Sequence, residues 1–291
     1  MCRLFGMSGG AEPVRATFWL LQAPDSLAQQ SRREPDGTGI GSFDGERPSV
    51  EKQVLAAFHD REFGREARER TSRTFVAHVR YASNGGLELQ NTHPFEQEGR
   101  LFAHNGVIGD VGALEHELGS ALSLVGGDTD SERFFALITR EIERCGDVGE
   151  GIAAAARWVA GHLPVLSINC VLVTPAELWA LRYPDSHELY VLERDAGGPS
   201  GSGSLEHRSP RGRIHVGSED LGDRPAVIVA TERMDDDPGW RKLRSGELLH
   251  VDGQLGVHSR RAVDFPPAHP LTLAELDPHA AESQRESQSG A

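Results

Sequence analysis

The pattern of apolar and polar positions predicts strands in two groups, with helices between them. The run at 74–81 alternates and has β-branched residues at intervals, which is typical of a strand, and a second strand is predicted at 100–104. Further strand-like runs follow at 167–174, 177–183, 189–192, 226–231 and 248–251. Helical spacing predicts two short helices between Val14 and Leu27 and longer ones over 131–144 and 152–160. This order of elements predicts a layered α/β domain.

Glycine and asparagine mark the expected ends of several elements. Glu34-Pro35-Asp36-Gly37-Thr38-Gly39 predicts a turn, followed by a hairpin of residues 40–43 and 50–54. The strand at 100–104 is expected to stop at Asn105-Gly106. Thr129 and Glu132 predict a capping box at the start of the helix over 131–144.

One domain over residues 2–264 accounts for these elements, and composition changes at two places. Gly197–Ser204 is rich in glycine and serine, which predicts a flexible loop at about 195–210. Residues 265–291 contain Pro, Ser, Glu and Gln with few large apolar side chains, which predicts a disordered tail.

Composition and charge exclude several classes of function. Of the 291 residues, 38% are hydrophobic, which is enough for a substantial core. The net charge of −14 argues against a general nucleic-acid surface and against an anionic membrane face. Cys2, Cys145 and Cys170 are widely spaced and form neither a disulfide framework nor a zinc pattern. With no signal-peptide pattern and no apolar run near the ~18 residues of a membrane span, the expected location is the cytoplasm.

Cys2 is the first candidate for catalysis. Removal of Met1 would leave Cys2 with a thiol and a free α-amine on one residue. An α-amine, with a pKa of about 7.7–8.0, accepts a proton near neutral pH, so it can serve as the base for the thiol. Leu4, Phe5 and Met7 suit a buried strand that holds this terminus rigidly.

Three further positions suit the binding of a charged substrate, although each also has an ordinary structural explanation. Arg80 ends a strand, where it either clamps a carboxylate or forms a surface ion pair. Asn105 and Gly106 offer an amide and a backbone N–H to an oxyanion, or form a plain Asn-Gly turn. Asp130 either binds an ammonium group or caps a helix.

Two histidines and two cysteines are assigned structural roles. His93 and His104 are far apart in sequence and lack a carboxylate at metal-ligand spacing, so packing roles are favoured over metal binding. Cys145 and Cys170 are expected to be inert thiols.

The order of these motifs resembles that of the class II glutamine amidotransferases, a branch of the N-terminal-nucleophile hydrolases. The motifs that carry the resemblance are Met1-Cys2, Asp36-Gly37-Thr38-Gly39, His78-Val79-Arg80-Tyr81-Ala82-Ser83, Thr92-His93-Pro94-Phe95, His104-Asn105-Gly106 and Asp128-Thr129-Asp130-Ser131-Glu132. The resemblance is specific to about residue 145. It continues more loosely to about 255 through Val229–Glu232 and Asp235–Trp240, which look like the stand-alone members, among them γ-glutamyl hydrolases similar to the ergothioneine-pathway enzyme.

The resemblance implies an α+β fold, a four-layer αββα sandwich of two antiparallel sheets. It implies Cys2 as nucleophile, its own amine as base, and Asn105 with the Gly106 N–H as oxyanion hole. Arg80, helped by Ser83, would bind the α-carboxylate of a γ-glutamyl group, and Asp130 its α-ammonium. No cofactor is expected. Thr38 stands where many stand-alone relatives have tryptophan, so the pocket wall there is expected to differ.

Three functions remain open at this point. The first is a self-contained hydrolase of a small-molecule γ-glutamyl substrate, and the second is a glutaminase that passes ammonia to a separate synthase. The residues after 255 are too few and too polar for a synthase domain, which favours the hydrolase. A non-catalytic γ-glutamyl-binding module is disfavoured, because a binder needs no nucleophile. The leaving amine, the pathway and the oligomeric state are not determined by the sequence.

Overall fold

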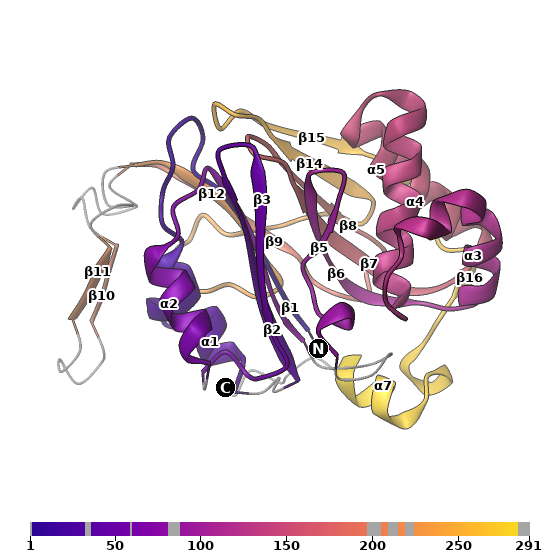
Figure 1. Cartoon of the computed structure of the whole chain (residues 1–291), viewed down its shortest axis with the longest axis horizontal. Helices are drawn as coiled ribbons and strands as arrows, with labels where there is room; N and C mark the ends of the chain where they lie inside the picture. Colours follow the sequence, from indigo (N-terminus) through magenta and orange to yellow (C-terminus); the bar gives the residue numbers. More distant parts are fainter. Residues whose placement is uncertain are drawn as a thin grey trace.

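Two stacked β-sheets form the centre of the computed structural model, which describes residues 2–32, 36–58, 60–80, 88–196, 205–208, 215–218 and 224–284 (Figure 1). The first sheet has the strand order β13-β9-β12-β1-β4-β2-β3. Its strands are β1 (Arg3–Ser8), β2 (Gly37–Asp44), β3 (Arg47–Gln53), β4 (Thr74–Arg80), β9 (Tyr190–Arg194), β12 (Ala226–Ala230) and β13 (Arg241–Lys242).

The second sheet has the order β15-β14-β8-β7-β6-β5, with β16 pairing beside β7. Its strands are β5 (Phe95–Gln97), β6 (Arg100–Ile108), β7 (Pro164–Val173), β8 (Leu178–Arg182), β14 (Glu247–Val251), β15 (Val257–Arg261) and β16 (His269–Pro270). All of these pairings are antiparallel except β16 with β7. A separate antiparallel pair joins β10 (Leu205–Arg208) to β11 (His215–Ser218).

Helices cover the outer face of each sheet. The first sheet is covered by η1 (Phe18–Gln22), α1 (Leu27–Gln30) and α2 (Arg61–Glu69). The second is covered by α3 (Val111–Leu118), η3 (Gly119–Leu124), α4 (Asp130–Cys145) and α5 (Val148–His162). The remaining turns and helices are η2 (Leu89–Asn91), η4 (Leu273–Glu275) and α7 (Pro278–Gln284). The fold is therefore the expected four-layer αββα sandwich, with helices on both outer sides in Figure 1.

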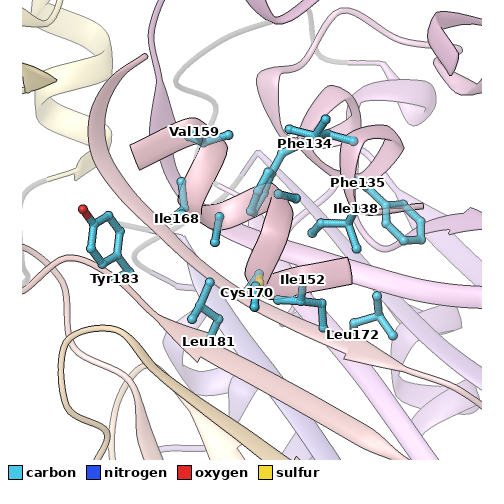
Figure 2. Packing of buried hydrophobic residues seen from close by; sticks show 14 of the residues in the cluster. Phe134, Phe135, Ile138, Ile152, Val159, Ile168, Cys170, Leu172, Leu181 and Tyr183 are labelled. Atoms are coloured by element: carbon cyan, nitrogen blue, oxygen red, sulfur yellow. The ribbon is translucent and has the colours of Figure 1, made fainter. Parts of the chain in front are cut away.

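Three apolar clusters hold the layers together. Figure 2 shows the cluster under α4 and α5, where Phe134, Ile138 and Ile152 pack onto Ile168 and Leu172 of β7. A middle cluster fills the space between the sheets, with Leu4 and Val76 on one side and Val171 and Leu249 on the other. The strands therefore bury both faces, which explains the nearly continuous burial of β1, β4, β6 and β7.

Sequence pattern predicted most elements of the sandwich. The hairpin forms between β2 and β3, and α4 and α5 extend the predicted helices by a few residues. Thr129 caps α4 as expected, since its hydroxyl accepts from the Glu132 N–H over 3.2 Å. The Glu132 carboxylate, however, accepts from the Gly127 N–H instead of completing the capping box.

Two turn predictions are wrong because strand pairing overrides the local signal. β6 does not stop at Asn105-Gly106: it runs on to Ile108, with Asn105 opposite Asn169 and Gly106 opposite Ile168 in β7. Gly37–Gly39 likewise lies within β2 and not in a turn. In both places the continuous ladder of a central strand outweighs the turn preference of glycine.

The expected disordered tail is also wrong over the part that the structure describes. His269–Pro270 pairs with β7 as β16, and the Leu271 N–H donates to the Val165 carbonyl over 2.8 Å. Helix α7 then buries Ala280, Ala281, Ser283 and Gln284. Residues 285–291 lie outside the described part. The sequence pattern did not predict that this segment packs against the domain, because the side chains that α7 buries are small or polar.

The predicted Gly/Ser-rich loop at about 195–210 is only partly described. Residues 197–204 and 209–210 lie outside the described part, and residues 205–208 form β10 where a flexible loop was expected. No helix in the described ranges is long and apolar enough to cross a membrane.

Candidate active site

The structure fixes Cys2 at the start of a central strand. β1 lies between β12 and β4, with Phe5 opposite Ala230 and Arg3 opposite Val79. The Leu4 N–H donates to the Thr231 hydroxyl over 3.3 Å, and the buried Arg3 forms a 2.8 Å ion pair with Glu232. These contacts hold the end of the strand, so Cys2 is placed precisely although only 8% of it is exposed.

A small cavity of about 20 Å³ brings Cys2 together with most of the residues that the sequence singled out. Arg80 from the end of β4, Gly106 from β6 and Asp130 from the start of α4 all line it. The remaining lining residues are His78, Asn91, His93, His104, Thr129 and Ser131. Ser83 lies outside the described residues, so its predicted role has no structural test.

Asn105 lies beside the nucleophile. Its side-chain Nδ2 donates to the Cys2 backbone carbonyl over 3.1 Å and thereby joins the two sheets at this point. An amide nitrogen carries two hydrogens, so one remains for a substrate oxygen. The buried Oδ1 of Asn105 has no hydrogen-bond partner among the described residues. Asn105 is therefore held next to Cys2 with a donor to spare.

Gly106 is required by close packing. A Cβ at this position would lie 1.8 Å from the Ser167 carbonyl oxygen and 3.0 Å from Nε2 of His104. No other residue type fits this position without displacing the β7 backbone. The backbone of β6 can therefore approach the cavity closely, as an oxyanion site needs.

Arg80 supplies the positive charge of the cavity. The side chain is 4% exposed, and burial lowers its pKa, while the charges of Cys2 and Asp36 act in the opposite direction. An arginine remains protonated under these conditions, so Arg80 places a fixed cation near Cys2. Such a group favours the thiolate form of a neighbouring cysteine.

Asp130 faces the cavity from the first turn of α4. Its two carboxylate oxygens accept backbone N–H bonds from Ile108 and Ser131, at 2.8 and 2.9 Å. These bonds orient the carboxylate, and its remaining lone pairs can still accept an ammonium group. The helix cap is Thr129, so the capping explanation of this aspartate is not needed.

Three histidines from separate segments of the chain also meet at the cavity. The rings of His78 and His93 lie 4.2 Å apart, and His104 contacts Ser131 through Nδ1 at 2.9 Å. His104 Nε2 lies 3.3 Å from the Ser167 carbonyl, an acceptor only, so Nε2 carries the proton and Nδ1 accepts from the Ser131 hydroxyl. The sequence treated His93 and His104 as separate packing residues and did not predict this cluster.

Burial keeps these histidines neutral. It lowers the pKa of His78 to about 3, with the charge of Arg80 acting in the same direction. Burial likewise lowers the pKa of His93 and of His104. No group of three or more His, Cys, Asp or Glu in the described part of the chain is arranged to hold a metal ion.

Gly39 lets the segment with His93 reach the cavity. A Cβ on Gly39 would lie 2.2 Å from the His93 carbonyl oxygen, so only glycine allows this segment to lie against β2. Thr38, by contrast, is not among the described lining residues of the Cys2 cavity. Its hydroxyl donates to the Leu55 carbonyl over 3.1 Å, and the expected effect of Thr38 on the pocket wall is not supported.

The surroundings of the cysteines distinguish Cys2 from the other two. All three are free thiols. Cys170 is buried in the apolar cluster under α5, where burial raises the pKa of its thiol to about 12. Cys145 is exposed at the end of α4. Cys2 is thus the one cysteine that lies beside both a buried arginine and a candidate oxyanion site.

Residues 1–269 match the family model of the class II glutamine amidotransferases, and the chain belongs to this family. A γ-glutamyl-hercynylcysteine sulfoxide hydrolase from Mycobacterium tuberculosis (strain CDC 1551 / Oshkosh) is 28% identical over 268 residues, covering 88% of this chain and 95% of that protein. The putative glutamine amidotransferase YafJ from Escherichia coli (strain K12) is 25% identical over 265 residues, covering 85% and 96%.

A solved structure supports the fold. The glutamine aminotransferase class-II domain protein SPO2029 from Silicibacter pomeroyi aligns with a TM-score of 0.59 and 21% identity over 91% of this chain and all of that one. Other relatives are longer: the chain spans 54% and 47% of two proteins that are each 29% identical to it.

Proposed function

We propose that this protein is a cysteine amidohydrolase that cleaves the γ-amide of a γ-glutamyl compound and releases glutamate. The observation that carries the proposal is the cavity in which Cys2, Arg80, Gly106 and Asp130 meet, with Asn105 bonded to the Cys2 carbonyl. The cavity brings the proposed nucleophile together with a cation, an anion and the backbone of Gly106, and the proposed amide donor Asn105 is bonded beside it.

In the proposed mechanism, Met1 is removed and the α-amine of Cys2 takes the proton of its thiol. The thiolate attacks the γ-carbonyl carbon, and the oxygen becomes negatively charged next to Asn105 and Gly106. The C–N bond then breaks, and the leaving amine takes the proton back from the α-ammonium group. Water, deprotonated by the same amine, hydrolyses the thioester to glutamate and regenerates Cys2.

Substrate recognition follows from the two charged groups in the cavity. A γ-glutamyl group carries an α-carboxylate and an α-ammonium at its far end. Arg80 suits the carboxylate because guanidinium binds carboxylates through two parallel hydrogen bonds. Asp130, held by two backbone N–H bonds, suits the ammonium. Ser83 is proposed to help Arg80 bind the α-carboxylate.

One relative of similar length favours a self-contained enzyme. The M. tuberculosis relative is named as a hydrolase of a γ-glutamyl conjugate, and the match covers 95% of its length. A chain of this size therefore suffices for hydrolysis in that protein. We accordingly propose that the leaving group here is larger than ammonia.

The test compares the purified full chain with Cys2→Ala, using a glutamine-mimicking affinity label and intact-mass measurement. The wild type should gain one label, begin at Cys2 and hydrolyse γ-glutamyl amides. Cys2→Ala should lose labelling and turnover, while the matched variant Cys145→Ala retains both. Active enzyme that still carries Met1 would contradict the mechanism, because the base would then be an amide.

The substrate class is tested with a panel of γ-glutamyl conjugates measured against glutamine. At least one conjugate should have a higher kcat/KM than glutamine. Glutamine as the preferred substrate, with activity that rises only when a candidate synthase is added, would instead establish a glutaminase that donates ammonia to that partner.

A further inference from the structure

A second and much larger cleft, of about 780 Å³, opens at the edge of the sandwich formed by β8, β13, β14 and β15. It contains none of the residues that line the Cys2 cavity. Its volume lies within the range of about 300–1,000 Å³ that is typical of small-molecule sites. Six of its lining side chains are cationic: Arg182, Arg241, Lys242, Arg244, Arg260 and Arg261.

This concentration of positive charge is unusual for the chain. The protein has 30 Lys and Arg against 44 Asp and Glu, so six cations would on average accompany about nine acidic residues. Only Asp185 and Glu247 line the cleft among the described residues. A local excess of positive charge attracts anions, even in a protein of net charge −14.

The two carboxylates of the cleft are already engaged. Asp185 accepts from Arg182 over 2.7 Å. Glu247 accepts from Arg241 over 2.9 Å, from the Ser259 hydroxyl over 2.8 Å and from the Arg244 N–H over 2.7 Å. Neither carboxylate therefore needs a metal or a further cation, and the uncompensated charge of the cleft is positive.

Two of the cations have no counter-ion among the described residues. Lys242 pairs with Glu188 over 2.8 Å, and Arg260 pairs with Glu150 over 3.1 Å. The side chains of Arg244 and Arg261 form no hydrogen bond or ion pair with the described residues. Both are exposed and line the cleft, so their guanidinium groups are available to a ligand.

Strand pairing and hydrogen bonds fix the positions of several of these cations. Arg182, Glu247 and Arg261 stand opposite one another across β8, β14 and β15, so their side chains leave the same face of the sheet. The buried Arg182 donates to the carbonyls of His187 and Leu243, over 2.8 and 3.1 Å. These bonds fix one cation at the base of the cleft.

A tight turn presents Arg244. The Glu247 N–H donates to the Arg244 carbonyl over 3.0 Å, and Gly246 has a φ of +75°. A side chain on Gly246 would lie 1.8 Å from the Val263 carbonyl oxygen, so the turn needs glycine for both reasons. Only glycine at this position gives Arg244 its place beside Arg241 and Glu247.

We propose that this cleft is a binding site for a small, multiply charged anion that carries a phosphate group. The guanidinium fork of arginine matches phosphate oxygens through paired hydrogen bonds, and five of the six cations are arginines. The site is separate from the Cys2 cavity: Arg182 lies two strands from Asn105 in the same sheet, roughly 10 Å away.

The test is calorimetric titration of the full chain with inorganic pyrophosphate at near-physiological ionic strength. We expect one saturable site in the wild type. Arg244→Gln/Arg261→Gln should weaken binding at least about tenfold, because two charge-assisted contacts are lost. Arg144→Gln, which removes an exposed arginine of α4 that is not part of the cleft lining, is the matched control and should bind as the wild type does.

Three results would overturn the proposal. The first is the absence of saturable binding, as expected if the cleft instead contacts an acidic protein surface. The second is equal loss of affinity in Arg144→Gln, which would indicate general charge attraction. The third is equal affinity for citrate, which would mean that phosphate is not recognised. Unchanged thermal melting of the double variant shows that lost binding is not lost folding, because neither side chain is buried.

Discussion

The side-chain amide of Asn105 donates a hydrogen bond to the backbone carbonyl of Cys2, with an N–O distance of 3.1 Å. Cys2 directly precedes β1 of the first sheet, and Asn105 lies in β6 of the second. The bond therefore fixes the proposed nucleophile relative to the proposed oxyanion donor across the interface between the sheets. Catalysis in this arrangement depends on how the two sheets pack, since no single loop carries both groups.

Asn105→Ala is expected to lower kcat about 10²–10³-fold with little change in KM, because the amide stabilises charge that develops only in the transition state. Steady-state kinetics on a γ-glutamyl amide provides the measurement. Asn169→Ala is the control: it removes an equally buried amide from the neighbouring strand, one that bonds to His187 and Tyr183 instead of the Cys2 carbonyl. A change in KM alone in Asn105→Ala would argue against the oxyanion role.

Arg80→Lys is expected to raise KM more than it lowers kcat. Arginine binds a carboxylate through two hydrogen bonds in both the ground and the transition state, and lysine cannot reproduce that geometry. Arg194→Lys, a similarly buried arginine of β9 outside the cavity lining, is the control and should leave KM unchanged. An Arg80→Lys enzyme with wild-type KM for a γ-glutamyl substrate would exclude Arg80 from the substrate site.

Asp130→Asn should likewise raise KM, because the neutral amide keeps the shape of the carboxylate but loses its attraction for the α-ammonium group. The decisive comparison uses substrates with and without that ammonium. The variant should discriminate less between a γ-glutamyl amide and its des-amino (glutaryl) analogue than the wild type does. Equal discrimination by both proteins would show that Asp130 does not contact the ammonium.

Stability should fall as the pH drops below about 6.5. Burial lowers the pKa of His78 to about 3 and of His187 to about 4, so the unfolded chain binds protons that the folded protein excludes. The stabilisation is complete above the ordinary pKa of 6.5 and is lost as the pH falls toward the folded value, at about 1.4 kcal/mol per pH unit for each histidine.

Urea unfolding between pH 7.5 and pH 5 measures this loss. His187→Gln should reduce the pH dependence by about one proton, since it removes one of the excluded sites. His162→Gln, at an exposed histidine at the end of α5, should leave the slope as in the wild type. A wild-type midpoint that stays constant over this range would show that the buried histidines do not control acid stability.

The sequence predicted which motif residues gather at the cavity. It did not predict the residues that reach the cavity only through the packing of the fold. Cys2, Arg80, Gly106 and Asp130 belong to ordered motifs, and the structure brings these four to one cavity. The roles assigned to them remain predictions. The cluster of His78, His93 and His104 was missed because its members come from β4, from the segment before β5 and from β6, and no local pattern records that proximity.

Long-range pairing explains the other differences. Asn105-Gly106 has the sequence of a turn, yet β7 supplies partners for both residues and the strand continues. The cationic cleft is also invisible in the linear sequence, because Arg182 and Arg261 are 79 positions apart and meet only through β14. The net charge of −14, counted over the whole chain, does not show where positive side chains gather.

Deleting residues 269–291 should destabilise the protein, in contrast to what the composition of this segment suggests. The deletion removes the pairing of β16 with β7, the 2.8 Å bond between the Leu271 N–H and the Val165 carbonyl, and the buried face of α7. It also removes Gln284, whose backbone influences the pKa of the buried His187 ring. We expect the melting temperature to fall by at least about 5 °C, because a loss of a few kcal/mol has this effect in a domain of this size.

A shorter deletion tests whether stability depends on the contacts of residues 269–284 or only on the length of the chain. Removing residues 285–291 takes away none of the contacts just named, so the melting temperature should stay at the wild-type value. Ala281→Asp in the full chain should reproduce most of the long deletion, because it places a charge at a buried position of α7. If the long deletion has the same melting temperature as the wild type, the burial of α7 contributes nothing to stability. The expectation of a disordered tail, drawn from composition, would then be correct.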